Sequence, residues 1–255
     1  MLRIESILKG YAIQAKDGAI GTVSDILFDD RTWMVRWVEV DTGRWLPGRK
    51  VLIHPSSVGR PDAERREISL ALTRQLIKES PSILQDQPVS RQMEYGLYDY
   101  YRWDPEWAGS TLDQRTMDPL VMPSPFFGGS DTRQAADANS RMNEGDPHLR
   151  SMAAVRGYHI HASDGAIGHL EDFLLDDGNW LIGYLIVDTK NWWFGQHVLI
   201  SPRAVQEISW DDHEMRVGLT RDQVRASPPW DPLHEIDEGY AKQLDTHYGW
   251  PSSWP

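Results

Sequence analysis

The apolar and polar positions of residues 10–81 follow the pattern of short β-strands separated by tight turns. Residues 11–15 form a short, mostly apolar stretch, and apolar residues alternate loosely with polar ones in residues 19–28. Lys16-Asp17-Gly18 stands between these two stretches, and an Asp-Gly pair in that position is a strong hairpin signal. The sequence therefore predicts two antiparallel strands joined by this turn.

Further strand signals follow in the same region. Residues 33–40 are β-branched and aromatic on both faces, as in a central strand that is covered on both sides. Lys50–Ile53 and Glu67–Leu72 are shorter strand candidates. Thr73 is a preferred N-cap residue, so a short helix is expected to end before Ser80-Pro81. Five or six short antiparallel strands and one helix are typical of a small β-barrel.

The whole pattern returns after 147 residues without a gap, because residues 2–107 and 149–254 share about 36 identities in 106 positions. Self-similarity of this extent indicates an internal duplication. Residues 108–148 between the copies are rich in Gly, Pro, Ser and Asp, which is typical of a flexible linker. We therefore predict a first copy in residues 1–107, a linker in residues 108–148 and a second copy in residues 149–255.

A set of turn and strand motifs occurs in residues 10–81 and again in residues 157–228. In the first copy these motifs are Gly10-Tyr11, Asp17-Gly18-Ala19-Ile20-Gly21, Asp25, Asp29-Asp30, Trp33, Val40-Asp41-Thr42 and Lys50-Val51-Leu52-Ile53-His54-Pro55. They resemble the PRC-barrel domain, a family named for the cytoplasmic part of the photosynthetic reaction-centre H subunit and also found in ribosome maturation factors. The resemblance implies a mainly β chain with two small antiparallel barrels in tandem. It also implies that the barrel serves as an adaptor or assembly surface and carries no catalytic residues.

Composition narrows the functional classes. The net charge of −12 argues against direct nucleic-acid binding, and the absence of Cys excludes disulfides and thiolate metal sites. The first copy has 15 basic and 16 acidic residues, whereas the second has 8 and 16. No apolar run approaches the roughly 20 residues of a membrane-spanning helix. We expect a cytoplasmic protein, with peripheral association at the inner membrane as the alternative.

Motifs for catalysis or ligand binding are scarce. We predict no catalytic residue, no cofactor and no bound metal. The candidate metal ligands would be His159 and His161, which share one face of a strand; the first copy has Ala12 and Gln14 at these positions. The repeated acidic residues, among them Asp29-Asp30, are interpreted as turn residues that bind their own backbone.

The chain has 12 Trp, more than a solvated surface favours. We expect the two copies to pair as an intramolecular pseudo-dimer with twofold pseudosymmetry, the aromatic tail of each copy crossing to the other. The residues expected to contact the other copy or a partner are Trp45, Trp103, Trp107, Trp192, Trp193, Trp250 and Trp254.

These observations together favour a non-enzymatic adaptor that binds one or more partner proteins. One alternative is a role like that of the reaction-centre H subunit, in the assembly of a photosynthetic electron-transfer complex. A second alternative is an adaptor in ribosome maturation or RNA processing. Both alternatives come from the resemblance, and the sequence leaves the identity of the partner open.

Overall fold

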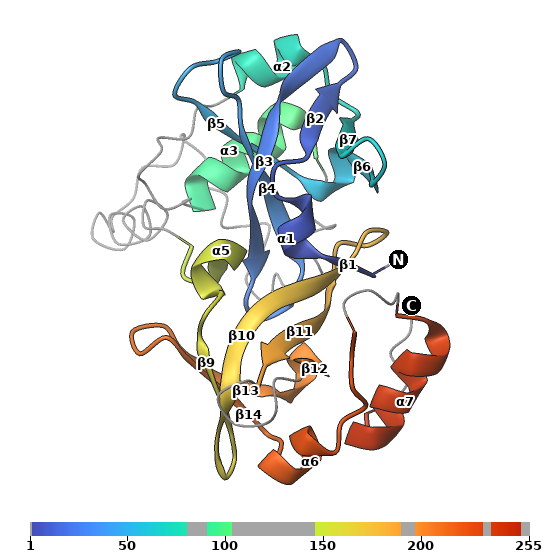
Figure 1. Cartoon of the computed structure of the whole chain (residues 1–255). Helices are drawn as coiled ribbons and strands as arrows, with labels where there is room; N and C mark the ends of the chain where they lie inside the picture. The colour runs from blue at the N-terminus through green and yellow to red at the C-terminus, as the bar shows by residue number, and fades with distance from the viewer. Residues whose placement is uncertain (1, 81–90, 104–145, 190–196, 232–235, 251–255) are drawn as a thin grey trace, which may run out of the picture. The chain divides into compact units, whose positions relative to one another are not determined.

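The computed structural model describes residues 2–80, 91–103, 146–189, 197–231 and 236–250, and it is mainly β (Figure 1). The chain divides into two compact units. Residues 10–150 form one, which we call the first-copy unit. Residues 1–9 and 151–255 form the other, which we call the second-copy unit.

Each unit is built on one sheet. The strands of the first-copy sheet are β2 (Ala12–Ala15), β3 (Gly18–Asp29), β4 (Val35–Asp41), β5 (Lys50–Ile53), β6 (Val58–Asp62) and β7 (Glu67–Leu70). Their order is β5-β4-β3-β2-β7-β6, with β8 (Leu149–Ser151) added to β3. Neighbouring strands are antiparallel except β2 and β7, which run parallel. The strands predicted from the alternation are therefore confirmed.

The second-copy sheet repeats this topology. Its strands are β9 (His159–Ala162), β10 (Gly165–Asp176), β11 (Ile182–Asp188), β12 (His197–Ile200), β13 (Val205–Ser209) and β14 (Glu214–Val217). Their order is β12-β11-β10-β9-β14-β13, and β1 (Leu2–Ile4) is added to β10. The tandem duplication predicted from the sequence is thus present as two sheets of the same strand order.

Neither sheet closes into a barrel among the described strands, because β5 and β6, like β12 and β13, stand at the two ends of their sheet. The chain leaves β5 through the 3-10 helix η1 (Pro55–Ser57), and leaves β12 through η4 (Pro202–Ala204). Pro lacks the N–H group that a ladder needs, so strand pairing is interrupted at this turn. The predicted barrels are therefore open, strongly bent sheets of barrel-like topology.

The duplication extends to unusual backbone conformations. Trp33 and Trp180, at equivalent positions, both have a φ of 59°, which few non-glycine residues adopt. At Gly21 a Cβ atom would lie 1.9 Å from the carbonyl oxygen of Asp41, and at Gly168 it would lie 2.0 Å from that of Asp188. Only glycine allows this close approach of two strands, which explains the retention of both glycines.

Short helices complete each unit. The Thr73 hydroxyl accepts a hydrogen bond from the Leu76 N–H at the start of α2 (Arg74–Glu79), and Thr220 forms a capping box with Gln223 at α6 (Arg221–Arg225), so both predicted helices are confirmed. The aromatic tails are helical as well, in α3 (Arg91–Tyr101) and α7 (Glu238–Tyr248). Two further short helices are α1 (Glu5–Leu8) and α5 (Met152–Val155). None of the described helices has the length and apolarity to span a membrane.

The predicted boundaries of the copies differ from the structural units at residues 1–9. β1 pairs antiparallel with β10, with Arg3 opposite Leu175 (Figure 1). The reason is a difference in strand length: β9 covers β10 only up to His169, so residues 174–176 have a free edge on that side. The equivalent edge of β3 is covered by β8. Each copy therefore receives the strand that precedes the other copy in the chain.

Candidate functional site

Equivalent ion pairs hold the two exchanged strands. Arg3 Nε of β1 lies 2.6 Å from Asp177 Oδ2, and Arg150 Nε of β8 lies 3.1 Å from Asp30 Oδ2. Both carboxylates are almost buried, at 4% and 9% side-chain exposure. The pKa of Asp177 lies below its ordinary value: burial alone would raise it, but the hydrogen bond from Arg3 and the neighbouring positive charges together outweigh burial. The Asp29-Asp30 repeat, interpreted as turn chemistry, thus also anchors the exchange.

A second contact of the N-terminal segment is formed by α1. Glu5, only 1% exposed, makes an ion pair with Arg156, and Arg156 Nη2 also lies 3.1 Å from Asp172 Oδ1. The Ser6 N–H group donates to the Asp172 carboxylate at 3.3 Å. The first copy has Lys9 where the second has Arg156, and the second has Met152 where the first has Glu5. The ion pair between Glu5 and Arg156 therefore has no counterpart in the first copy, where the equivalent residues are Met152 and Lys9.

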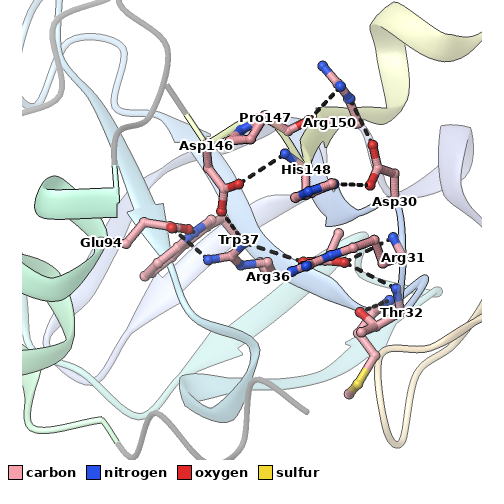
Figure 2. A network of polar contacts seen from close by, with 12 residues as sticks. Asp30, Arg31, Thr32, Arg36, Trp37, Glu94, Asp146, Pro147, His148 and Arg150 are labelled. Atoms are coloured by element: carbon pink, nitrogen blue, oxygen red, sulfur yellow. Dashed lines mark hydrogen bonds and ion pairs between the residues drawn. The ribbon is translucent and has the colours of Figure 1, made fainter. Parts of the chain in front are cut away.

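A buried polar network occupies the first-copy unit (Figure 2). Arg36 of β4 donates from Nη1 to Asp146 and from Nη2 to Glu94 of α3, each at 2.6 Å. Trp37 Nε1 donates to the other oxygen of Glu94 at 2.5 Å. Asp29 lies 3.5 Å from Arg36 Nη1. One guanidinium thus joins a strand, a helix and the chain that leads into β8.

The guanidinium of Arg36 is held in its charged form. Burial alone would lower the pKa of Arg36, but the Glu94 and Asp146 carboxylates outweigh it and raise the pKa above its ordinary value. Asp146 belongs to the predicted linker, yet its side chain is 1% exposed, and His148 beside it bonds Asp30 at 2.9 Å. The last three residues of the predicted flexible linker are therefore fixed in place. Residues 104–145 lie outside the described residues.

An aromatic cluster adjoins the network. His54 packs edge-on against Trp37 and Tyr98, and Trp103 lies 5.5 Å from the His54 ring. Burial, assisted by the nearby charge of Arg36, lowers the pKa of His54 to about 4, so its ring is neutral at pH 7. Burial also raises the pKa of Tyr98 to about 12. These groups sit in a packed interior, and their protonation is fixed across the physiological range.

The second copy lacks this network because it has Gly183 and Ala241 where the first copy has Arg36 and Glu94. The space beside Gly183 is filled by Leu2 of β1, whose Cδ2 lies 3.0 Å from the position of a Cβ on that glycine. The same place in the fold is therefore polar in the first copy and apolar in the second. The surroundings of the two exchanged strands therefore differ: β1 packs on an apolar site, whereas β8 follows directly after a polar network.

The tryptophans predicted to seal the two copies behave differently. Trp103 Nε1 donates to Ser57 Oγ at 2.6 Å, and its ring stacks on Tyr101 and contacts Trp37, all within the first-copy unit. Its own copy thus supplies Trp103 with a polar partner and an aromatic pocket, and a contact of Trp103 with the other copy stays a prediction. Trp250 likewise stacks on Tyr248 of its own unit, at 4.4 Å. Trp107, Trp192, Trp193 and Trp254 lie outside the described residues.

Trp45 lines an open hollow of about 240 Å³ on the first-copy unit. The other lining residues are Asp17, Arg74, Gln75 and Lys78. The Arg74 guanidinium lies over the Trp45 ring, 4.9 Å from its centroid, and the Arg74 N–H donates to Asp17 at 2.6 Å. Sequence reasoning found Trp45 and missed the cations. The sequence feature that could have pointed to Arg74 is the pair Thr73-Arg74, which the second copy repeats as Thr220-Arg221.

The predicted metal candidates His159 and His161 belong to no group of three converging ligand atoms in the described part of the chain. Both lie on β9, where His159 is exposed and His161 Nε2 lies 3.5 Å from a Glu214 oxygen. Among the described residues, the side chains whose ligand atoms meet are Glu171, Asp188 and His197, with all three atoms within 4.8 Å of one another. Sequence reasoning missed this group because its members stand on three strands.

Comparison with known proteins finds a match for part of the first copy. No curated protein matches the chain. The matched region contains β2 to β7 and Gly21. Residues 6–70 match the family of the PRC-barrel domain.

Proposed function

We propose that this protein is a non-enzymatic adaptor, built from two PRC-barrel-like modules, that binds a partner protein at the Trp45 hollow of the first copy. The hollow is the observation that carries this proposal. It combines an indole face with two cationic side chains on an open surface, and aromatic and Arg side chains are the residues enriched at the energetic centres of protein interfaces.

The chemistry of the hollow favours an acidic segment as the partner. Among the described residues Arg74 makes no ion pair, and its Nε has no hydrogen-bond partner although it is buried. Lys78 is exposed at the rim. A carboxylate that approaches the guanidinium over the Trp45 ring would receive charge-assisted hydrogen bonds, while the ring excludes water from one side.

The second copy supports the view of a repeated module. Arg221 donates its N–H to Asp164 as Arg74 does to Asp17, so the helix start beside the hollow is built in the same way twice. We propose that the second sheet is a second PRC-barrel-like module and that the two modules form an intramolecular pseudo-dimer. The reaction-centre and ribosome-maturation roles remain alternatives that differ in the partner they require.

The test is affinity capture from an extract of the native cell with the full chain as bait. Trp45→Ala combined with Lys78→Glu removes the indole and reverses one charge of the hollow. Arg65→Glu, at an exposed turn of the same unit, is the matched control for charge. A partner recovered with the parent chain is then purified and its binding is measured directly with all three proteins.

We expect a partner with an acidic segment that binds the parent and Arg65→Glu equally and the hollow variant at least about tenfold more weakly, since loss of an interface anchor costs more than about 1.4 kcal/mol. Reaction-centre subunits or ribosomal components among such partners would support one of the two alternatives. Equal binding of the hollow variant would refute the hollow as the binding surface.

A further inference from the structure

The second-copy sheet carries a row of histidine and acidic residues across neighbouring strands. His169 of β10 stands opposite Asp188 of β11, and Asp188 stands opposite His197 of β12. Directly opposed residues of an antiparallel pair project from the same face of the sheet. Glu171, two residues after His169, joins this row at a register shift of β10. His159 of β9 stands opposite His169 on the other side, so five potential metal ligands of the described strands are gathered on one face.

We propose that Glu171, Asp188 and His197 bind a divalent transition-metal ion, with His169 as a further donor. The carboxylate oxygens and the imidazole nitrogen of the first three lie within 4.8 Å of one another. Four ligands at about 2.0–2.2 Å around Zn²⁺ lie roughly 3.3 Å from one another. Movements of the ligand atoms by about 1–2 Å, through side-chain rotation, therefore suffice to close the site. His169 Nε2 is already 3.8 Å from Asp188 Oδ2.

The state of His197 is a second observation that points to a ligand. Its Nε2 is shielded from solvent and makes no hydrogen bond with the described residues, although Glu171 Oε2 lies only 2.6 Å away. The two atoms thus face each other without the angle that a hydrogen bond requires. Two ligands of one cation would face each other in this way and move apart to roughly 3.3 Å when the ion binds.

Burial and donor type define the class of ion. Asp188 is 5% exposed, so its carboxylate is held in position by the sheet, while Glu171 closes the site from the solvent side. Imidazole nitrogen is a poor ligand for Ca²⁺ and Mg²⁺ but a good one for Zn²⁺, Ni²⁺ and Cu²⁺. With no Cys in the chain, a nitrogen and oxygen donor set is the one available. We therefore assign the site to a borderline cation such as Zn²⁺.

The first copy provides an internal control. At the positions of His169, Glu171 and His197 it has Thr22, Ser24 and Lys50. The Lys50 ammonium lies 2.8 Å from Glu39 Oε1, so a fixed cationic side chain occupies the corresponding end of β5. The aspartate of the row is the one member that both copies share, as Asp41 and Asp188. The proposed site is thus a property of the second copy alone, and one ion is expected per chain.

The experiment measures Zn²⁺ binding to the full chain after treatment with a chelator. Zinc content is determined by elemental analysis after dialysis, and affinity by competition with a chromophoric zinc indicator. The test variant is Glu171→Ser with His197→Lys, which introduces the residues of the first copy. A second variant, His159→Ala with His161→Gln, does the same for the other histidine pair. Asp41→Asn is the control in the first copy.

We expect one zinc ion per chain in the parent, in Asp41→Asn and in the His159 and His161 variant. The Glu171 and His197 variant should bind at least about 100-fold more weakly, since it removes two ligands. Its melting temperature should not rise on addition of zinc, whereas that of the parent should. Thermal melting in the presence of chelator checks that all variants fold.

Two results would overturn the assignment. The first is a parent chain that takes up no zinc at micromolar concentration. The second is a Glu171 and His197 variant that retains parental affinity, whether or not the His159 and His161 variant loses it. If Mg²⁺ or Ca²⁺ displaces zinc at equal concentration, the assignment to a borderline cation also fails.

Discussion

Arg3 and Asp177 form an ion pair at 2.6 Å although 174 residues separate them in the chain. The equivalent pair in the other copy is Arg150 and Asp30, 120 residues apart. In each pair the arginine belongs to the short strand that precedes one copy, and the aspartate to the turn after the long strand of the other. The same two residue types therefore anchor both exchanged strands.

A disulfide test distinguishes the observed pairing from its alternative. Ile4 stands opposite Leu174 of β10, and the residue of β3 that corresponds to Leu174 is Leu27. The chain has no Cys, so Ile4→Cys with Leu174→Cys introduces the only thiols. Directly opposed strand residues have Cα atoms about 4.5–5.5 Å apart, which a disulfide can bridge. We expect oxidation to form the intramolecular bond, seen as a mobility shift on non-reducing gels.

The matched control is Ile4→Cys with Leu27→Cys, which would bridge only if β1 stayed with its own copy. We expect this variant to remain reduced under the same conditions. Efficient oxidation of the control and none of the first variant would mean that the strands are not exchanged.

Loss of Glu94 should destabilise the first-copy unit. Glu94→Ala removes the acceptor of Trp37 Nε1 and the partner of Arg36 Nη2, and leaves a guanidinium of 15% exposure short of one counter-charge. Breaking a buried pair in this way costs about 3–5 kcal/mol. Urea unfolding followed by Trp fluorescence measures the change. Glu64→Ala, on an exposed turn, should stay within about 0.5 kcal/mol of the parent, and an equal effect of both variants would contradict the role of the network.

The neutral state of His54 should make stability depend on pH. Its pKa is about 4 in the folded protein and 6.5 in the unfolded chain, so the unfolded chain takes up a proton first as the pH falls. The contribution of the neutral His54 ring to the free energy of unfolding is therefore complete above pH 6.5. It is lost as the pH falls from 6.5 to 4, and the total loss approaches about 3 kcal/mol. Urea unfolding at pH 7, 5.5 and 4.5 follows this loss.

His54→Ser is the matched variant for this prediction, because the second copy has Ser201 at the same position and both residues accept the N–H two residues on. The variant is expected to be less stable at pH 7, since it opens space beside Trp37 and Tyr98, but to lose less stability on acidification. Parallel pH profiles for the two proteins would show that His54 is not the titrating group.

Two glycines should respond in opposite directions to replacement by alanine. Gly21→Ala places a Cβ 1.9 Å from the Asp41 carbonyl oxygen, so β3 and β4 must separate locally; we expect a loss of at least about 3 kcal/mol. Gly96→Ala adds its Cβ to α3 with no atom within 4 Å, and should stabilise by about 0.5–1 kcal/mol. Thermal melts compare both with the parent. A tolerated Gly21→Ala would show that the two strands approach less closely.

Local signals predicted much of the fold. Alternation and the Asp-Gly turns predicted β2 and β3, and Thr73 predicted the start of α2. These features are determined by residues that are close together in the chain, so the sequence alone is enough to predict them. β1 and β8 are only three residues long, and their pairing depends on a free edge left by the unequal lengths of β9 and β10. No local pattern in the sequence predicts this pairing, although both strands contain the same pair of residues, as Leu2-Arg3 and Leu149-Arg150.

The candidate sites likewise combine residues that the sequence makes recognisable with residues that only the fold brings together. Trp45 was recognisable because Trp is unusual on a surface, whereas its cationic neighbours Arg74 and Lys78 come from a helix almost thirty residues later. The histidine pair on β9 was visible as a sequence pattern, but the ligand set that converges comes from three strands. Register across strands decides such sites, and register is a tertiary property.

The exchange of strands also constrains the order in which the protein can fold during synthesis. Residues 2–4 are synthesised well before their partners in β10, which end at Asp176. At about 5–20 residues per second, the first strand waits roughly 10–35 s for its partner. In the same period the edge of β3 is vacant until residues 149–151 appear. A nascent chain therefore exposes one unpaired strand and one unpaired edge, and only the second copy supplies Gly183 and Arg156, the partners of Leu2 and Glu5.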